Sequence, residues 1–190
     1  MKRQIFKLSF LMVLSGTLFL SSCKKDDPQP DTNEEEVITT MQLVFVPQGG
    51  GTTVTYKFDD PDGPGGTAPT QDAIQLQASK VYDVTVQLLN KTVTPAEDIT
   101  VEVAEESDAH RFYYEPSAAS NITVTGLNND VNGIPLGITS VWTTGAAGTG
   151  TNKITLRHYP GTPPNKAAGD PVNSTKSGTD IEVNFSTVVN

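Results

Sequence analysis

Apolar and polar residues alternate with a period of two along several short segments of the chain. In segment 82–88, apolar residues take the even positions and polar residues the odd ones. Segments 152–158 and 179–185 show the same alternation. Successive side chains of a β-strand point to opposite faces, so this period indicates strands with one face in a core and one face in solvent. Antiparallel sheets that are covered on one side only have this pattern.

Ten such segments, rich in Val, Ile, Thr, Tyr and Phe, are separated by turn-forming residues. They are 37–46, 52–59, 73–76, 82–90, 99–103, 111–114, 121–128, 140–144, 153–158 and 180–188. Segment 97–109 also fits a short helix, because Glu-rich and Ala-rich sequence follows the alternating Ile99, Val101 and Val103. Ten short strands predict an all-β, immunoglobulin-like antiparallel β-sandwich over residues 37–190, with Trp142 in its core. The single cysteine excludes an internal disulfide.

The first 22 residues have the features of a lipoprotein signal peptide. A basic start (positions 2, 3 and 7) precedes an apolar segment, 8–20, which is too short to remain in a bilayer as a spanning helix. Leu20-Ser21-Ser22-Cys23 follows and resembles a bacterial lipobox. We therefore expect cleavage before Cys23, a diacylglycerol on its thiol and an acyl chain such as palmitate on its amine. Several chains together anchor a protein stably in the lipid bilayer, where one chain does not.

Residues 23–36 are predicted to form a flexible acidic tether, since they are polar, charged and proline-containing. The run Lys24-Lys25-Asp26-Asp27 resembles the surface-export signal of Bacteroidetes lipoproteins, which implies the cell-surface side of the outer membrane. A periplasm-facing lipoprotein is the alternative. Residues 1–22 contain three basic and no acidic residues, so their removal changes the net charge from −9 to −12. Such an acidic chain is not expected to bind nucleic acid.

The chain has two histidines, and the first follows an acidic run. Glu105, Glu106 and Asp108 all lie within five residues of His110. Glu106 and His110 would share a face of a helix, and a loop would also allow both to reach one ion. His158, at the end of a predicted strand, offers a second imidazole. These five residues suit Zn²⁺ or Cu²⁺ by ligand type, so a transition-metal site is one hypothesis and a solvated acidic surface is the other.

Other chemistry has weaker support in the sequence. The chain has no Gly-x-Ser-x-Gly motif and its only thiol is expected to be lipidated, so we predict a non-enzymatic protein. Segments 59–63 and 128–133 place oxygen-bearing residues before a glycine, which suits Ca²⁺ but is also typical of tight turns. Segment 159–177 is expected to be a long exposed loop. A glycan-binding module is an alternative function if Tyr113 or Trp142 lies exposed beside a groove.

Several segments together resemble a Bacteroidetes family of small lipoproteins. They are 35–40, 82–90, the acidic run into 110–114, 142–148 and 155–160. Members often have the label "type 1 periplasmic binding fold superfamily protein", which implies an α/β fold, whereas this sequence lacks the length and helices for one and predicts an all-β fold. Some members are encoded beside TonB-dependent outer-membrane receptors. The resemblance therefore implies a surface accessory in metal or nutrient uptake; a structural or adhesive lipoprotein is the alternative.

Overall fold

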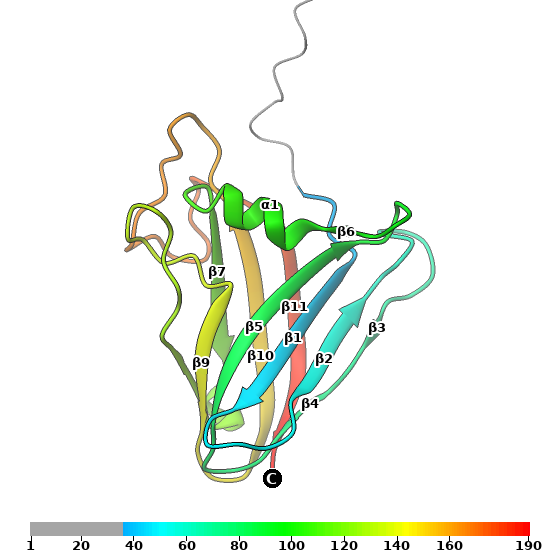
Figure 1. Cartoon of the computed structure of the whole chain (residues 1–190), viewed down its shortest axis with the longest axis vertical. Coiled ribbons are helices and arrows are strands. Elements are labelled where there is room, and N and C mark those ends of the chain that lie inside the picture. The colour runs from blue at the N-terminus through cyan, green and yellow to red at the C-terminus, as the bar shows by residue number, and fades with distance from the viewer. Residues whose placement is uncertain (1–35) are drawn as a thin grey trace, which may run out of the picture. The chain divides into compact units, whose positions relative to one another are not determined.

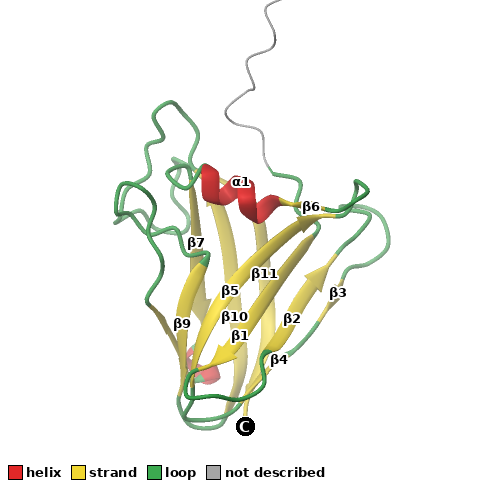
Figure 2. Cartoon of the chain, in the orientation of Figure 1, coloured by secondary structure: helices red, strands yellow, loops and turns green. Residues whose placement is uncertain are grey.

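The computed structural model describes residues 36–190, which form two β-sheets on either side of a shared hydrophobic core (Figure 1 and Figure 2). This arrangement confirms the predicted all-β sandwich. The predicted signal peptide (1–22), the lipidation site Cys23 and the tether as far as residue 35 lie outside the described residues. Among the described helices, none combines the length and the apolar character needed to span a bilayer.

The first sheet contains seven strands, each antiparallel to its neighbours. In spatial order they are β3 (Thr70–Gln71), β2 (Val54–Asp59), β1 (Thr40–Pro47), β5 (Val81–Asn90), β9 (Thr139–Thr144) and β8 (Ile122–Thr125), with β6 (Glu97–Asp98) paired to the end of β5. In β5 the even residues are buried while Asp83 and Thr85 are exposed, as the alternation predicts. The strands β3 and β6 have two residues each, too few to show any period.

The second sheet has four strands. In spatial order they are β4 (Ile74–Leu76), β11 (Gly178–Val189), β10 (Gly148–His158) and β7 (His110–Pro116). The pairs β11–β10 and β10–β7 are antiparallel, whereas β4 lies parallel to the last residues of β11. The chain changes sheets between β3 and β4, and it arrives beside β11 in the same direction. One parallel pair is thus added to an otherwise antiparallel sandwich.

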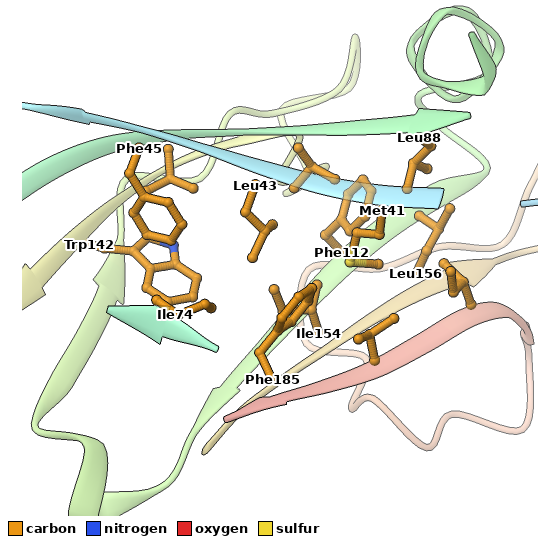
Figure 3. Packing of buried hydrophobic residues seen from close by; sticks show 14 of the residues in the cluster. Met41, Leu43, Phe45, Ile74, Leu88, Phe112, Trp142, Ile154, Leu156 and Phe185 are labelled. Atoms are coloured by element: carbon orange, nitrogen blue, oxygen red, sulfur yellow. The ribbon is translucent and has the colours of Figure 1, made fainter. Parts of the chain in front are cut away.

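The core lies between the sheets and receives side chains from both (Figure 3). The labelled members are fully buried or nearly so: Met41, Leu43, Phe45, Leu88 and Trp142 from the first sheet, and Ile74, Phe112, Ile154, Leu156 and Phe185 from the second. Trp142 has no exposed surface, as predicted, and packs edge-on against Phe45 with ring centroids 5.2 Å apart. Its indole N–H donates to the hydroxyl oxygen of Ser140 at 3.0 Å, so burial leaves this donor satisfied.

Segment 97–109, which fits a strand or a helix by its pattern, contains the helix α1 (Ile99–Glu105). Asp98 caps the helix, since its side chain accepts a hydrogen bond from the N–H of Thr100 at 3.0 Å. Ile99 and Val103 are buried, while Val101 between them is 56% exposed. Ile99 and Val103 are four residues apart, and this spacing fits both the period of a strand and that of a helix. Only the exposure of Val101 shows that the segment is a helix. Figure 1 shows α1 lying across one end of the sandwich.

Strand β10 begins at Gly148, inside a glycine-rich segment whose pattern predicts a turn. The reason is a close approach of the short 3₁₀ helix η1 (Ala118–Ser120). A Cβ atom on Gly148 would lie 2.6 Å from the carbonyl oxygen of Ala119, and one on Gly150 would lie 2.6 Å from the backbone nitrogen of Ser120. These glycines therefore allow η1 to pack against the start of the strand. The glycine-rich composition of the segment does not distinguish this close packing from a turn.

Candidate functional site

His110 and His158 are direct partners in a pair of strands. His110 is the first residue of β7 and His158 is the last residue of β10. The antiparallel register of these strands places the two residues opposite each other. Cβ atoms at opposite positions are about 4.5–5.5 Å apart, and the two rings stack with centroids 4.6 Å apart and an interplanar angle of 26°. The sheet itself therefore brings the two histidines of the chain together.

Glu106 joins them from the end of α1. It is the C-cap residue of the helix, where its N–H donates to the carbonyl oxygen of Glu102 at 2.8 Å. The Glu106 carbonyl oxygen accepts hydrogen bonds from the N–H of Ala109 at 2.9 Å and from Nδ1 of His110 at 3.1 Å. This turn places ligand atoms of Glu106, His110 and His158 within 4.8 Å of one another.

These three residues differ in their access to solvent. His110 is fully buried, His158 is 6% exposed and Glu106 is exposed. A pocket of about 170 Å³ lies beside them, between the α1–β7 turn and the loop that follows β10. Glu106, His158, Asp108 and Thr162 are among the residues that line it. An ion bound at the two rings would be reached through this pocket.

The electrostatics favour neutral His110. Burial lowers the pKa of its imidazole to about 4; the Glu106 carbonyl opposes this shift, and His158 and Lys166 add to it. The ring is therefore neutral at neutral pH, which is the protonation state in which an imidazole binds a metal ion. Two imidazole nitrogens and one carboxylate oxygen are a set that holds Zn²⁺ with an open fourth position, and the same donor types suit Cu²⁺.

A buried carboxylate, Asp180, lies behind His110. Its Oδ2 atom is 3.7 Å from Nε2 of His110, and neither side chain has exposed surface. The sequence pattern predicts the opposite orientation, because Asp180 alternates with the apolar residues Ile181 and Val183 and should face solvent. That prediction is wrong. Asp180 instead faces the interior, on the side of the His110 ring away from the nitrogen that contacts Glu106.

The inward orientation of Asp180 results from a β-bulge. Leu156 of β10 pairs with Ile181 of β11, but the next residue, Arg157, pairs with Thr179. One residue of β11, Asp180, is therefore left without an opposite residue in the ladder. A bulge of this kind locally changes the direction of a side chain relative to the regular alternation. No pattern of residue types marks its position in the sequence.

Lys166 fastens the loop after β10 to the candidate site. Its side chain is 1% exposed, and its ammonium group donates to the carbonyl oxygens of Ser107 at 2.6 Å and His110 at 2.8 Å. Its third partner is the Asp130 carboxylate, 2.7 Å away. Burial opposes the charge on Asp130, but Lys166 and two backbone N–H groups outweigh this effect and lower the pKa of the carboxyl. Three separate loops thus meet at one ammonium group.

The loop after β10 has no helix or strand, but it is held at several more points. Arg111 donates to three carbonyl oxygens between Ala167 and Asp170, at 3.0 to 3.4 Å. The Arg111 guanidinium also lies over the ring of Tyr113, 4.5 Å from its centroid. The hydroxyl groups of Tyr113 and Tyr159 are 2.6 Å apart, and Tyr159 is fully buried. Segment 159–177 is therefore a long loop with many exposed residues, as the composition predicts, and these contacts attach it to β7.

The five predicted metal ligands fall into three groups. Glu106, His110 and His158 form the cluster. Asp108 lines the adjacent pocket without joining the cluster. Glu105 is exposed and belongs to neither. Successive residues of a helix leave its axis about 100° apart, so only one of the two neighbouring glutamates can face the rings.

The two segments that suit Ca²⁺ use their carboxylates within the chain instead. Asp59 accepts a hydrogen bond from Thr40 at 2.6 Å and pairs with Lys91 at 2.6 Å. Asp62 accepts from the N–H of Thr67 at 2.8 Å. In the other segment, Asp130 is occupied by Lys166 and by backbone N–H groups of its own turn. The local backbone contacts of Asp62 and Asp130 are those of turns, which is the alternative that the sequence allows, while Asp59 pairs across the sheet and with Lys91.

The two aromatic residues singled out for glycan binding are not exposed platforms. Trp142 is fully buried in the core. Tyr113 is partly covered by Arg111, and its hydroxyl group is bound to Tyr159 and to the carbonyl oxygen of Asp170. Stacking on a sugar requires an accessible aromatic face; Trp142 has none, and one face of the Tyr113 ring is occupied by Arg111.

Sequence reasoning missed two residues that support the cluster. Asp180 belongs to a strand with regular alternation, and Lys166 lies in a polar, proline-rich segment where a lysine is ordinarily solvated. The position of each depends on contacts between segments far apart in the chain.

No family model, curated protein or solved structure matches this chain.

Proposed function

We propose that this protein is a lipid-anchored, non-enzymatic binding protein of the outer membrane that holds Zn²⁺ or Cu²⁺ between Glu106, His110 and His158. The observation that supports it is the proximity of their ligand atoms, which lie within 4.8 Å of one another. Two of the three ligands are opposite residues of paired strands. Their spacing is set by the sheet and does not depend on a loop.

The cluster needs only a modest contraction to coordinate an ion. Zinc ligands lie about 2.0–2.2 Å from the metal in a tetrahedral arrangement, which places ligand atoms roughly 3.4 Å apart. Glu106 is exposed at the end of α1, so its side chain can move toward the rings at little cost. The fourth position would then face the pocket of about 170 Å³ and be open to water or to a partner. An open position suits an ion that is passed on.

Delivery to an outer-membrane receptor is the role we propose for such an ion. The lipobox at Cys23 and the following Lys24-Lys25-Asp26-Asp27 support a lipid anchor on the cell surface. The resemblance to lipoproteins encoded beside TonB-dependent receptors supports such a receptor as the partner. Replacing Cys23 with Ala should abolish incorporation of labelled palmitate and move the protein out of the membrane fraction. An unchanged membrane fraction for Cys23→Ala would contradict the anchor.

Metal binding is tested by titration calorimetry of the full-length chain, purified without a histidine tag, with ZnCl₂ and with CuSO₄. We expect one ion per chain. The variants Glu106→Gln and His158→Ala should each weaken binding at least about tenfold, by analogy with the loss caused by removing groups that support a metal site. Glu105→Gln removes the same charge from the neighbouring residue and should bind as the unchanged chain does.

Two results would contradict the proposal. One is the absence of saturable binding of either ion by the unchanged chain. The other is equal weakening by Glu105→Gln and Glu106→Gln, which would indicate a diffuse acidic surface. Circular dichroism of each variant shows whether it is folded. If His158→Ala does not fold, the comparison of Glu105→Gln with Glu106→Gln still tests the proposal, because both glutamates are exposed.

A further inference from the structure

The buried ring of His110 lies between two oxygen atoms on opposite sides. Nδ1 is 3.1 Å from the carbonyl oxygen of Glu106, and Nε2 is 3.7 Å from Oδ2 of Asp180. The second distance exceeds that of a normal hydrogen bond, about 2.7–3.2 Å. Nε2 is buried and makes no hydrogen bond with any residue that the structure describes.

A neutral imidazole has one N–H group and can donate to only one of these oxygens. A carbonyl oxygen only accepts, so the contact with Glu106 requires the proton to be on Nδ1. The lone pair of Nε2 then faces the side chain of Asp180, and Nε2 has no donor among the described residues. Moving the proton to Nε2 would direct its N–H at Asp180 but would leave the lone pair of Nδ1 facing the Glu106 carbonyl. Neither tautomer alone satisfies both sides of the ring.

A cation on the Nδ1 side removes this conflict. Resting on the proposed metal site, we propose that His110 binds the ion through Nδ1 while its Nε2–H donates to Asp180, which makes Asp180 a positioning residue for this ligand. Nδ1 is the nitrogen on the side of Glu106, whose carboxylate is another member of the cluster. Nε2 is directed at a carboxylate that is not a member. The tautomer change loses one proton from Nδ1 and gains one at Nε2, so it is neutral overall.

The surroundings of Asp180 suit this role. Metal-binding histidines ordinarily donate their second N–H to a carboxylate or a carbonyl, which fixes the tautomer and the orientation of the ring. Asp180 has no side-chain exposure, and the β-bulge in β11 directs it at His110 instead of solvent. The Nε2–Oδ2 distance should shorten from 3.7 Å to about 2.8 Å when the ion binds, as expected for a hydrogen bond to a charged acceptor.

The tautomer of His110 can be read directly by long-range ¹H–¹⁵N correlation spectroscopy on the full-length chain. The chain has only two histidines, so two imidazole spin systems are expected, and His158→Ala assigns them. Without metal, the proton of His110 should be on Nδ1. With one equivalent of Zn²⁺, the proton should be on Nε2 and Nδ1 should show the shift of a metal-bound nitrogen. Zinc bound through Nε2 of His110 would overturn the inference while leaving the metal site itself intact.

A matched pair of variants on β11 provides the second test. Asp180→Asn should weaken zinc binding about 10–100-fold, the usual effect of losing such a support, and should reduce the share of the Nε2–H tautomer. Glu182→Gln removes the same charge two residues away, from a side chain that is 48% exposed, and should leave both readouts unchanged. Unchanged affinity in Asp180→Asn would overturn the positioning role. If Asp180→Asn does not fold, the tautomer of the unchanged chain decides alone, and failure of the unchanged chain to bind zinc would instead refute the proposed function.

Discussion

The ammonium group of Lys166 and the carboxylate of Asp130 form an ion pair 2.7 Å apart in which neither side chain is more than 1% exposed. Burial lowers the pKa of Lys166 even though Asp130 opposes this shift. For the Asp130 carboxyl the hydrogen bonds outweigh burial, whereas for the Lys166 ammonium group burial outweighs the pairing. In such a pair the removal of one partner is costly, because the other charge remains buried.

Replacing Lys166 with Met should lower the free energy of unfolding by about 3–5 kcal/mol, because Asp130 and the carbonyl oxygens of Ser107 and His110 lose their donor. Urea denaturation measures the loss. Lys176→Met is the control, since Lys176 pairs with Asp170 at a surface position and should cost less than about 1 kcal/mol. The double change of Lys166→Met with Asp130→Asn should recover part of the loss, and equal losses in both lysine variants would show that the buried pair has no special role.

The orientation of α1 predicts different effects for two valines. Val103 is fully buried, and Val103→Ala should cost about 1–3 kcal/mol through lost burial and a small cavity. Val101 is 56% exposed, and Val101→Ala should change stability by less than about 0.5 kcal/mol, since alanine also favours the helix. Thermal unfolding of both variants tests this. A strand over 99–103 would place both valines on one face and give them similar losses.

The pH dependence of stability should contain a contribution from Glu36. Burial and the carboxylates of Glu102 and Glu106 raise its pKa from 4.5 to about 7. A raised pKa means that the folded state holds the proton more tightly than the unfolded state. The stabilisation is therefore complete below pH 4.5 and is lost as the pH rises toward 7.

Measured as a function of pH, the unfolding free energy of Glu36→Gln should gain on that of the unchanged chain between about pH 4.5 and 7 and run parallel to it above. Other titrating groups contribute to both curves and cancel in the difference. Glu105→Gln, at an exposed position, provides the comparison. Curves that stay parallel from pH 4 to 8 would show that Glu36 is not protonated more tightly in the fold.

Zinc should stabilise the folded chain by mass action. At a free concentration one hundred times the dissociation constant, the gain is about 2.7 kcal/mol. Denaturation with and without ZnCl₂ measures it, and excess chelator should reverse it. The gain should fall to about 1.4 kcal/mol or less in His158→Ala, whose affinity is expected to be at least about tenfold weaker, and it should be retained in Glu105→Gln. The same gain in His158→Ala would mean that zinc binds elsewhere on the chain.

The strands of the sandwich can be predicted from the sequence where they are long enough to show the alternation of apolar and polar residues. The even residues of 82–88 and the apolar residues of 181–185 face the core as the alternation predicts. The helix α1 is ambiguous because Ile99 and Val103 fit both periods. The sequence does not predict that the first residues of β10 form a strand. Glycines there allow η1 to pack closely, but a glycine-rich segment is also typical of a turn. Local pattern thus predicts faces well, and it fails where contacts between distant segments decide the backbone.

The candidate site is less predictable for the same reason. The residue types at His110, Glu106 and His158 suggest a common ligand, but their meeting depends on the register of β7 with β10. Single-sequence patterns do not specify which strands pair, or in which register. Lys166 gives no signal at all, because its burial depends on three carbonyl and carboxylate oxygens from other loops.

The bulge in β11 has a consequence for how this site could be gained or lost in evolution. From Gly148 to Leu156, β10 pairs residue by residue with β11, and the single extra residue of β11 is Asp180. A deletion of that residue would restore a regular ladder and keep the core residues in place, yet it would remove the carboxylate behind His110. If Asp180 positions His110 as proposed, a difference of one residue in strand length is enough to separate sandwiches that support a metal-binding histidine from those that do not.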